Sequence, residues 1–254
     1  MEVTQPNSNR FLKGLIYAPS GHGKTRFLGT ANDDPRTAPT IMLDYEGGTQ
    51  SLVGRDIDIV KIESWETFNE VYKFLSSSDH KYKSVSLDSI SETHIFALLQ
   101  LLSNDTRNRK IPDLLEQGDY GIALVQMRRL LRSFRDLPLH VFASALSKTD
   151  LDPREGSIIK PSLAGAMADE VQAIFDIVGY LSLATMQGEE GEETHRVLLL
   201  QNYPKYRTKA RMPENVTDVP DELVDPSVTS LLDALHFDAE PNQPTTRKVT
   251  KRGK

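Results

Sequence analysis

The segment Gly14-Leu-Ile-Tyr-Ala-Pro-Ser-Gly-His-Gly-Lys-Thr25 decides the predicted fold. Its apolar run, Leu15 to Ala18, predicts a buried strand, and a glycine-rich turn then leads into a segment with helical character. The pattern Ala18-x-x-x-x-Gly23-Lys24-Thr25 is that of a P-loop with alanine in place of the usual first glycine. Short patterns also arise by chance, but a match placed between a strand and a helix has the context that this motif requires.

Each part of this loop has a chemical reason. Glycines at 21 and 23 permit positive φ, so backbone N–H groups can converge on an anion. Lys24 is expected to reach the β- and γ-phosphates of a nucleotide, and the Thr25 hydroxyl to ligate Mg²⁺. The sequence therefore predicts ATP and Mg²⁺ as cofactors. The residues expected to contact the nucleotide are Pro19, Ser20, Gly21, His22, Gly23, Lys24, Thr25 and Arg26.

Composition sets further bounds. The chain has 254 residues and no cysteine, which excludes disulfides and thiolate metal sites and suits a reducing compartment. It has no apolar run near the ~20 residues that a membrane span needs, and Met1–Asn9 is too polar for a signal peptide. We therefore expect a soluble cytoplasmic protein with no membrane partner.

Charge is distributed unevenly along the chain. The formal net charge is −6, but residues 241–254 carry five basic and no acidic side chains, so residues 1–240 carry −11. We predict a flexible N-terminus over residues 1–10, one domain over 11–237 and a disordered basic tail over 238–254. The tail could add non-specific phosphate affinity or only aid solubility.

Predicted strands and helices alternate through the domain, which indicates an α/β fold with a mostly parallel sheet flanked by helices. Two strands around an acidic turn, at 176–185 and 196–201, predict a C-terminal antiparallel hairpin. Residues 103–118 and 146–162 are polar and are predicted to be long loops. The helix expected over 119–137 is predicted to turn Ile122 and Val125 inward. The other expected strands cover 40–45, 56–62, 83–88 and 139–145, and the other helices cover 64–75, 90–102, 163–175 and 226–236.

Two acids follow predicted strands and suit the chemistry of a P-loop. Asp88, at the end of Val85-Ser86-Leu87, is the candidate that completes the Mg²⁺ shell, although a strand-end or helix-capping role also fits it. Glu46, after the strand that ends near Asp44-Tyr45, is the candidate base that activates water, or else a solvated loop acid. Ser89 directly after Asp88 excludes a catalytic glutamate at that position, where many AAA+ ATPases carry one.

These segments together resemble a known family. The strand, P-loop and helix, with Leu43-Asp44-Tyr45-Glu46-Gly47-Gly48 and Val85-Ser86-Leu87-Asp88-Ser89, look like the RecA-type ATPase core. The narrower resemblance is to compact RecA-like ATPases of tailed bacteriophages, described as phage nucleotide-binding or AAA-family proteins, some of which act in single-strand annealing. Later stretches support it, namely Leu163–Glu170 with Phe175–Tyr180, and Thr208–Arg211. The resemblance covers about residues 11–235 and implies a RecA-like ATPase domain.

The resemblance implies roles for matched positions. Glu46 is the catalytic glutamate, and Ser144 falls where this class carries a polar γ-phosphate sensor, usually the longer glutamine. Lys209 and Arg211 match a Lys-x-Arg pair that reaches the nucleotide of a neighbouring subunit, as arginine fingers do. The alternative for this pair is a basic surface loop.

The resemblance also implies single-stranded DNA as a partner, bound by loops that follow Asp88's helix and the sensor strand. Acidic side chains are present in the same loops, and neither holds an evident aromatic stacking platform. The candidate DNA-binding residues are Arg107, Arg109, Lys110, Lys148, Arg154 and Lys160.

The leading interpretation is a Mg-dependent RecA-like ATPase that assembles as a ring or filament on single-stranded DNA in phage recombination, annealing or repair. A phage single-strand-binding protein is a possible further partner. Two alternatives stay open at this point. One is a nucleotide-gated assembly module with little turnover, and the other is a P-loop kinase that phosphorylates a small molecule.

Overall fold

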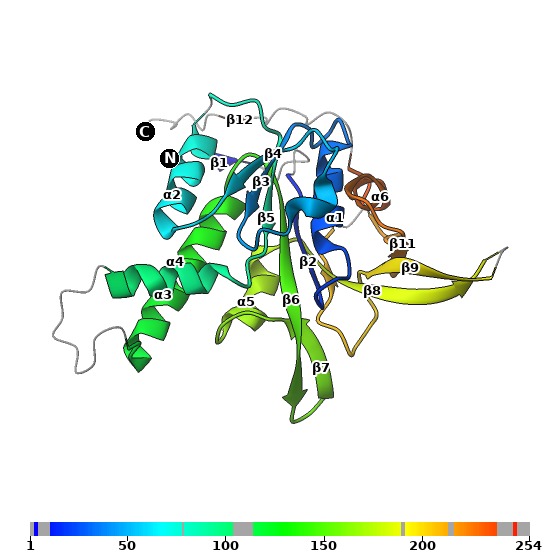
Figure 1. Ribbon diagram of the computed structural model, residues 1–254. Coiled ribbons are helices and arrows are strands. Elements are labelled where there is room, and N and C mark those ends of the chain that lie inside the picture. The colour runs from blue at the N-terminus through cyan, green and yellow to red at the C-terminus, as the bar shows by residue number, and fades with distance from the viewer. Residues whose placement is uncertain are drawn as a thin grey trace, which may run out of the picture.

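The computed structural model describes residues 3–4, 11–77, 79–103, 114–188, 191–212, 216–237 and 246–247. Most of these residues build one α/β domain around a central sheet (Figure 1). The strands that form the parallel part of the sheet are β2 (Lys13–Ala18), β3 (Thr40–Asp44), β4 (Asp58–Lys61), β5 (Ser84–Asp88), β6 (His140–Asp152) and β8 (Ile177–Gln187). The helices are α1 (Lys24–Gly29), α2 (Trp65–Ser76), α3 (Thr93–Ser103), α4 (Gln117–Arg135), α5 (Met167–Ile174) and α6 (Val228–Ala234).

The order of strands across the sheet places the P-loop strand near its middle. Within the described residues the order is β11-β9-β8-β2-β6-β5-β3-β4, with β9 at Glu192–Leu199 and β11 at Glu222–Val224. Neighbours from β8 to β4 run parallel, whereas β9 pairs antiparallel with β8 and β11 antiparallel with β9. The predicted α/β fold, with a mostly parallel sheet and a C-terminal antiparallel hairpin, is confirmed.

Helices cover both faces of the sheet, so its central part is buried. Leu15 and Tyr17 of β2 pack in one apolar cluster with α2, α4 and α5. Ile16 and Ala18 face the other way and pack with α1 and α6. Every residue of β2, β3 and β5 is buried, which is the expected pattern for parallel strands covered on both faces. In Figure 1, α2 and α4 lie on one side of the sheet, and α1 and α6 on the other.

Local sequence signals account for several element ends. The Ser64 side chain accepts a hydrogen bond from the Thr67 N–H, so it caps α2 as its position in the sequence predicts. Helix α6 begins after Ser227, whose hydroxyl accepts a hydrogen bond from Ser230 N–H. No helix in the described part of the chain is long and apolar enough to cross a bilayer.

The predicted loop over 146–162 is wrong, because these residues form a β-hairpin. Strand β6 continues to Asp152, and β7 (Gly156–Pro161) returns antiparallel to it, with Ser147 opposite Pro161. This hairpin extends beyond the sheet (Figure 1), and several of its residues are exposed. Only Ile158 and Pro161 of β7 are buried, so the segment lacks regular apolar alternation and its sequence is easily mistaken for a loop.

The predicted inward face of α4 needs correction, and the predicted domain boundaries at the two termini stay open. Ile122 and Val125 of α4 are 44% and 40% exposed, not inward, since the buried positions in this part of the helix are Asp119, Ala123 and Met127. The termini contribute a two-stranded sheet of β1 (Val3–Thr4) and β12 (Thr246–Arg247). The other residues of the predicted N-terminal segment and basic tail lie outside the described residues, so those domain boundaries stay predictions. The short strand β10 (Lys209–Ala210) pairs with β8.

Candidate functional site

The P-loop lies where β2 ends and α1 begins, at the carboxyl edge of the parallel strands (Figure 1). Gly21 and Gly23 have φ of 81° and 94°, the left-handed conformation that the sequence predicted for this turn. The Lys24 ammonium group crosses the loop and donates hydrogen bonds to the carbonyl oxygens of Ala18 at 3.2 Å and Pro19 at 3.0 Å. The loop therefore has the backbone conformation and the cation that phosphate binding needs.

The Thr25 hydroxyl contacts the candidate metal-binding acid directly. It donates a 2.5 Å hydrogen bond to one carboxylate oxygen of Asp88, at the end of β5. The other carboxylate oxygen of Asp88 accepts a short hydrogen bond from the hydroxyl of Ser144, which is fully buried in β6. Two hydroxyl groups from separate elements thus converge on the Asp88 carboxylate.

Burial and charge act against each other at these groups. Burial raises the pKa of Asp88, while the hydrogen bonds from Ser144 and Thr25 lower it and the nearby Glu46 carboxylate raises it further. Burial also lowers the pKa of Lys24, and the carboxylates of Glu46 and Asp88 oppose that shift. A cation and two carboxylates therefore share one edge of the sheet, close enough to influence one another's ionisation.

The turn after β3 presents Glu46 to this group. The Asp44 carboxylate, almost fully buried, accepts hydrogen bonds from the backbone N–H groups of Glu46 at 3.1 Å and Gly47 at 2.9 Å. An aspartate that binds backbone N–H groups two and three residues ahead fixes a tight turn. Glu46 is exposed, and its carboxylate accepts a 2.5 Å hydrogen bond from the Ser89 hydroxyl. The same turn brings Gly48 against Thr25, since a Cβ at Gly48 would lie 3.8 Å from the Thr25 hydroxyl oxygen.

These donors fit a magnesium ion bound together with a nucleotide. Mg²⁺ prefers oxygen ligands and is usually held by one or two carboxylates, phosphate oxygens and water. The Thr25 hydroxyl and the Asp88 carboxylate supply two adjacent oxygen donors beside the loop. In such sites the ion neutralises charge on the transferred phosphate.

Other residues predicted for the site lie elsewhere or are otherwise engaged. The Lys209 ammonium group donates hydrogen bonds to the carbonyls of Gln172 and Phe175, where α5 ends. Arg211 is exposed near the same helix end, and its backbone N–H donates to the Asp176 carbonyl. The Lys209 ammonium group therefore binds the end of α5. Their role toward a neighbouring subunit, and the sensor role of Ser144, stay predictions.

The candidate DNA-binding residues divide into two groups. Arg107, Arg109 and Lys110 lie outside the described residues. The others lie on or beside the β6–β7 hairpin, where Lys160 pairs with Asp150 at 2.8 Å and Lys148 donates to the Leu163 carbonyl at 3.1 Å. Arg154 is exposed at the hairpin turn.

Sequence reasoning missed two contacts at this site. One is the bond between Ser89 and Glu46, since Ser89 is noted in the sequence only as the residue that displaces a catalytic acid. The other is Arg196 of β9, whose guanidinium Nε donates to the His22 carbonyl in the P-loop at 3.2 Å. No local motif marks Arg196, and only the pairing of β9 with β8 brings it to the loop.

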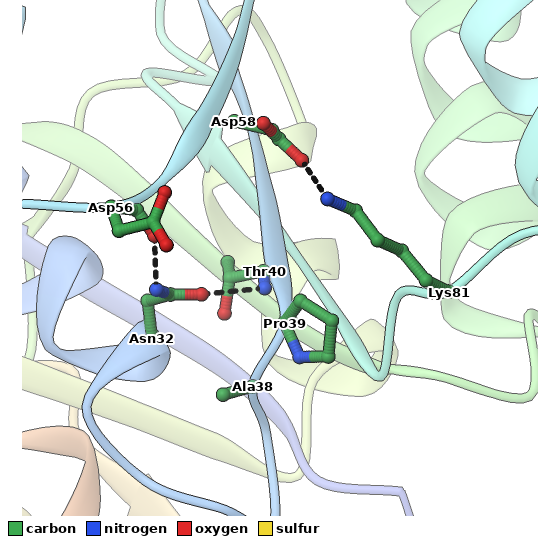
Figure 2. A pocket seen from close by; sticks show the side chains of 7 residues that line it. All are labelled: Asn32, Ala38, Pro39, Thr40, Asp56, Asp58 and Lys81. Carbon is green, nitrogen blue, oxygen red and sulfur yellow. Dashed lines mark hydrogen bonds and ion pairs between the residues drawn. The ribbon is translucent and has the colours of Figure 1, made fainter.

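A separate hollow at the opposite edge of the sheet is not the nucleotide site. It lies at the start of β3 and β4, far along the strands from the P-loop, and holds about 230 Å³. That volume is below the roughly 300–1,000 Å³ of typical ligand pockets. Figure 2 shows Asp58 paired with Lys81 across it, at 2.8 Å. Its lining residues are Asn32, Ala38, Pro39, Thr40, Asp56, Asp58 and Lys81.

The strand order, the loop and its two carboxylates define the chain as a P-loop NTPase with a RecA-like fold. A family model described as "AAA domain" matches residues 10–212, so the chain belongs to this AAA domain family. No curated protein matches the sequence.

Two of the solved structures that match illustrate the structural similarity. A crystal structure of the RadB recombinase matches with a TM-score of 0.46 and 13% identity, covering 84% of this chain and 86% of that one. An ATPase from the type III secretion system of pathogenic bacteria matches with a TM-score of 0.38 and 15% identity, covering 67% of this chain and 51% of that one. Similarity at these levels assigns no substrate or partner.

Proposed function

We propose that the chain is a Mg-dependent ATPase in which Glu46 activates the attacking water. The observation that carries this proposal is the convergence of Lys24, the Thr25–Asp88 pair and Glu46 at one edge of the sheet. Lys24 would neutralise phosphate charge, and Thr25 with Asp88 would hold the metal ion. The exposed Glu46 carboxylate, fixed by its Ser89 hydrogen bond and the turn at Asp44, would accept the proton of water.

We also propose that the ATPase works as an assembly on single-stranded DNA, with Lys209 or Arg211 completing the site of a neighbouring subunit. Lys24 is a cation of this chain that interacts with the carboxylates of Glu46 and Asp88, and a second cation from another subunit would stabilise charge in the transition state. The DNA role and the setting in phage recombination rest on the family resemblance of the sequence. Arg154 at the exposed hairpin turn is the best-placed described residue for a phosphate contact.

A second function has one observation in its favour. The Ser144 hydroxyl is buried and bonded to Asp88, so this side chain does not extend toward the γ-phosphate as a longer sensor would. A site without such a sensor suits a nucleotide-gated assembly module with slow turnover.

The test is ATP hydrolysis with and without single-stranded DNA over a series of salt concentrations. Wild-type protein should hydrolyse ATP, Lys24→Ala should not, and Lys83→Ala is the matched control because Lys83 bonds to the Pro35 carbonyl away from the loop. Stimulation by DNA that fades as salt rises is expected from phosphate contacts. Absence of hydrolysis in the wild type despite ATP binding would favour the assembly module. A DNA effect absent at every salt concentration would refute the DNA role.

A further inference from the structure

Arg196 is packed directly against the back of the P-loop. It lies on β9, and its Nε donates to the His22 carbonyl at 3.2 Å. A Cβ at Gly23 would fall 2.4 Å from the same nitrogen, closer than real Cβ atoms approach any neighbour. Glycine is therefore required at position 23 for two reasons. A larger side chain would collide with Arg196, and the φ of 94° is a conformation that favours glycine.

The geometry of the peptide bond determines what this contact does. In a planar trans peptide the C=O and the following N–H point in opposite directions. Arg196 binds the His22 carbonyl, so the Gly23 N–H on the same peptide unit points away from Arg196. N–H groups of a P-loop point into the concave side that holds phosphates. The guanidinium group thus fixes and polarises one of the peptide units that the loop would use.

Asp225 holds the backbone of Arg196 in place through two hydrogen bonds. Its carboxylate accepts a hydrogen bond from the Arg196 N–H at 3.1 Å, and its own N–H donates to the Arg196 carbonyl at 2.6 Å. The other carboxylate oxygen of Asp225 is 2.6 Å from Nδ1 of His195. Asp225 directly follows β11, which pairs with β9. Strand β9 is therefore fixed at the residue that reaches the loop.

The charge of Arg196 has one nearby acid, Asp225, whose pKa it helps to lower. The side chain is half-buried, and the described residues provide no carboxylate within ion-pair distance of its guanidinium group. A half-buried cation is commonly paired when its role is only structural. Here its charge remains available next to a loop built for an anion.

We propose that Arg196 is a positioning residue for nucleotide binding, which orients the His22–Gly23 peptide and adds positive charge behind the phosphate loop. The proposal rests on the proposed nucleotide binding by the P-loop. Arg196 acts through the loop and not on the reacting atoms, so it should stabilise bound nucleotide equally before and during hydrolysis. Such a contribution appears in KM and in the dissociation constant, with kcat unchanged.

The experiment compares Arg196→Met, Arg196→Lys and wild type by calorimetric titration with ADP and Mg-ATP, and by steady-state hydrolysis. Met keeps the apolar stem but has neither donor nor charge, and Lys keeps both. Arg196→Met should weaken ADP and ATP binding and raise KM about tenfold, as expected for a lost hydrogen bond from a charged donor. Arg196→Lys should stay within about threefold of wild type. Arg135→Met is the control, because Arg135 is paired with Asp136 at the end of α4.

Each other outcome has a definite meaning. Unchanged binding in Arg196→Met would overturn the proposal, as would a fall in kcat with unchanged KM, which indicates loss of folded protein. If Arg196→Lys binds as weakly as Arg196→Met, the planar guanidinium contacts phosphate itself, and the positioning role is wrong. If wild-type protein binds neither ADP nor ATP, while its melting temperature shows that it is folded, the proposed function fails instead.

Discussion

The Thr25 hydroxyl donates a 2.5 Å hydrogen bond to Asp88, so the residue that ends the P-loop pattern is joined to the carboxylate at the tip of β5. The two residues are 63 positions apart in the chain. Strand β6 lies between β2 and β5, so the contact spans an intervening strand at the carboxyl edge of the sheet. The Asp88 carboxylate thereby lies next to the hydroxyl with which it would share a metal ion.

From this pairing we expect Asp88→Asn to weaken Mg²⁺ binding in the presence of nucleotide by about 10–100-fold, the usual effect of removing a group that orients or holds a metal. An amide keeps the size of the carboxylate but not its charge. The measurement is the Mg²⁺ concentration that gives half-maximal ATP hydrolysis. Binding of ADP without Mg²⁺ should be retained, and its loss would show that Asp88 supports the loop itself.

Ser144 gives a prediction about pH. Its hydroxyl lowers the pKa of Asp88, which burial raises, so Ser144→Ala should raise that pKa further. If the carboxylate form is needed, hydrolysis is lost as pH falls through this pKa. The acid limb of the pH–rate profile should therefore move to higher pH by about one unit, since a hydrogen bond to a charged group is worth about 1.5 kcal/mol or more.

The matched control for Ser144→Ala is Ser86→Ala. Ser86 is also fully buried in a central strand, but its hydroxyl has no hydrogen-bond partner among the described residues. Its removal should leave the pH–rate profile unchanged. An equal shift of the acid limb in both variants would mean that the effect comes from packing and not from the bond to Asp88.

Glu46→Gln separates water activation from nucleotide binding. Gln keeps the size of the side chain and can accept the hydrogen bond from Ser89, but it is a poor base. Hydrolysis should fall by about 10²–10⁴-fold, the range for loss of a general base, while ATP affinity stays close to wild type. Glu63→Gln is the control, an exposed acid paired with Lys61. Retained hydrolysis in Glu46→Gln would remove Glu46 from the proposed mechanism.

The sequence predicted the parts of the site that local chemistry specifies. The P-loop glycines, Lys24 and Thr25 form a contiguous pattern, and Asp88 ends a wholly buried strand. The turn at Glu46 could be placed because an acid and two glycines follow another such strand.

Features that depend on distant contacts could not be predicted in this way. Arg196 and His22 are 174 residues apart, and nothing near Arg196 indicates the loop that it will contact. The Lys209 bonds to the end of α5 join positions 37 and 34 residues apart, so the sequence could not show that this cation is already engaged. The β6–β7 hairpin was missed for another reason, since many of its residues are exposed and the regular apolar alternation that marks a strand is lost.

Replacing Lys209 should mainly lower stability, whereas replacing Arg211 should mainly lower ATP hydrolysis. Lys209 donates to two carbonyls at a helix end, so Lys209→Met should lower stability by about 1 kcal/mol, seen as a lower melting temperature. Arg211→Ala should affect hydrolysis more than stability if Arg211 completes a neighbouring site. A mixture of Lys24→Ala and Arg211→Ala proteins should then regain activity that neither has alone. Failure of the mixture would argue against a site shared between subunits.

His140 should make the fold sensitive to acid. The ring is buried beside Phe11 and Phe142, and its Nδ1 accepts a hydrogen bond from the Leu12 N–H at 3.1 Å, which requires the neutral form at that nitrogen. Burial, aided by the charge of Lys13, lowers the pKa of His140 from 6.5 to about 4. Between these values the unfolded chain binds the proton and the folded chain does not, so the free energy of unfolding should fall as pH drops from 6.5 to 4.

The size of this effect should reach about 3 kcal/mol near pH 4, from the difference between the two pKa values. Urea unfolding of wild type and His140→Asn at pH 6.5, 5.5 and 4.5 measures it, since an amide oxygen can replace Nδ1 as acceptor but does not titrate in this range. The stability difference between the two proteins should shrink as pH falls. If the difference in free energy of unfolding between wild type and His140→Asn stays constant with pH, the ring binds protons equally in the folded and unfolded states. The proposed effect of acid on His140 would then be wrong.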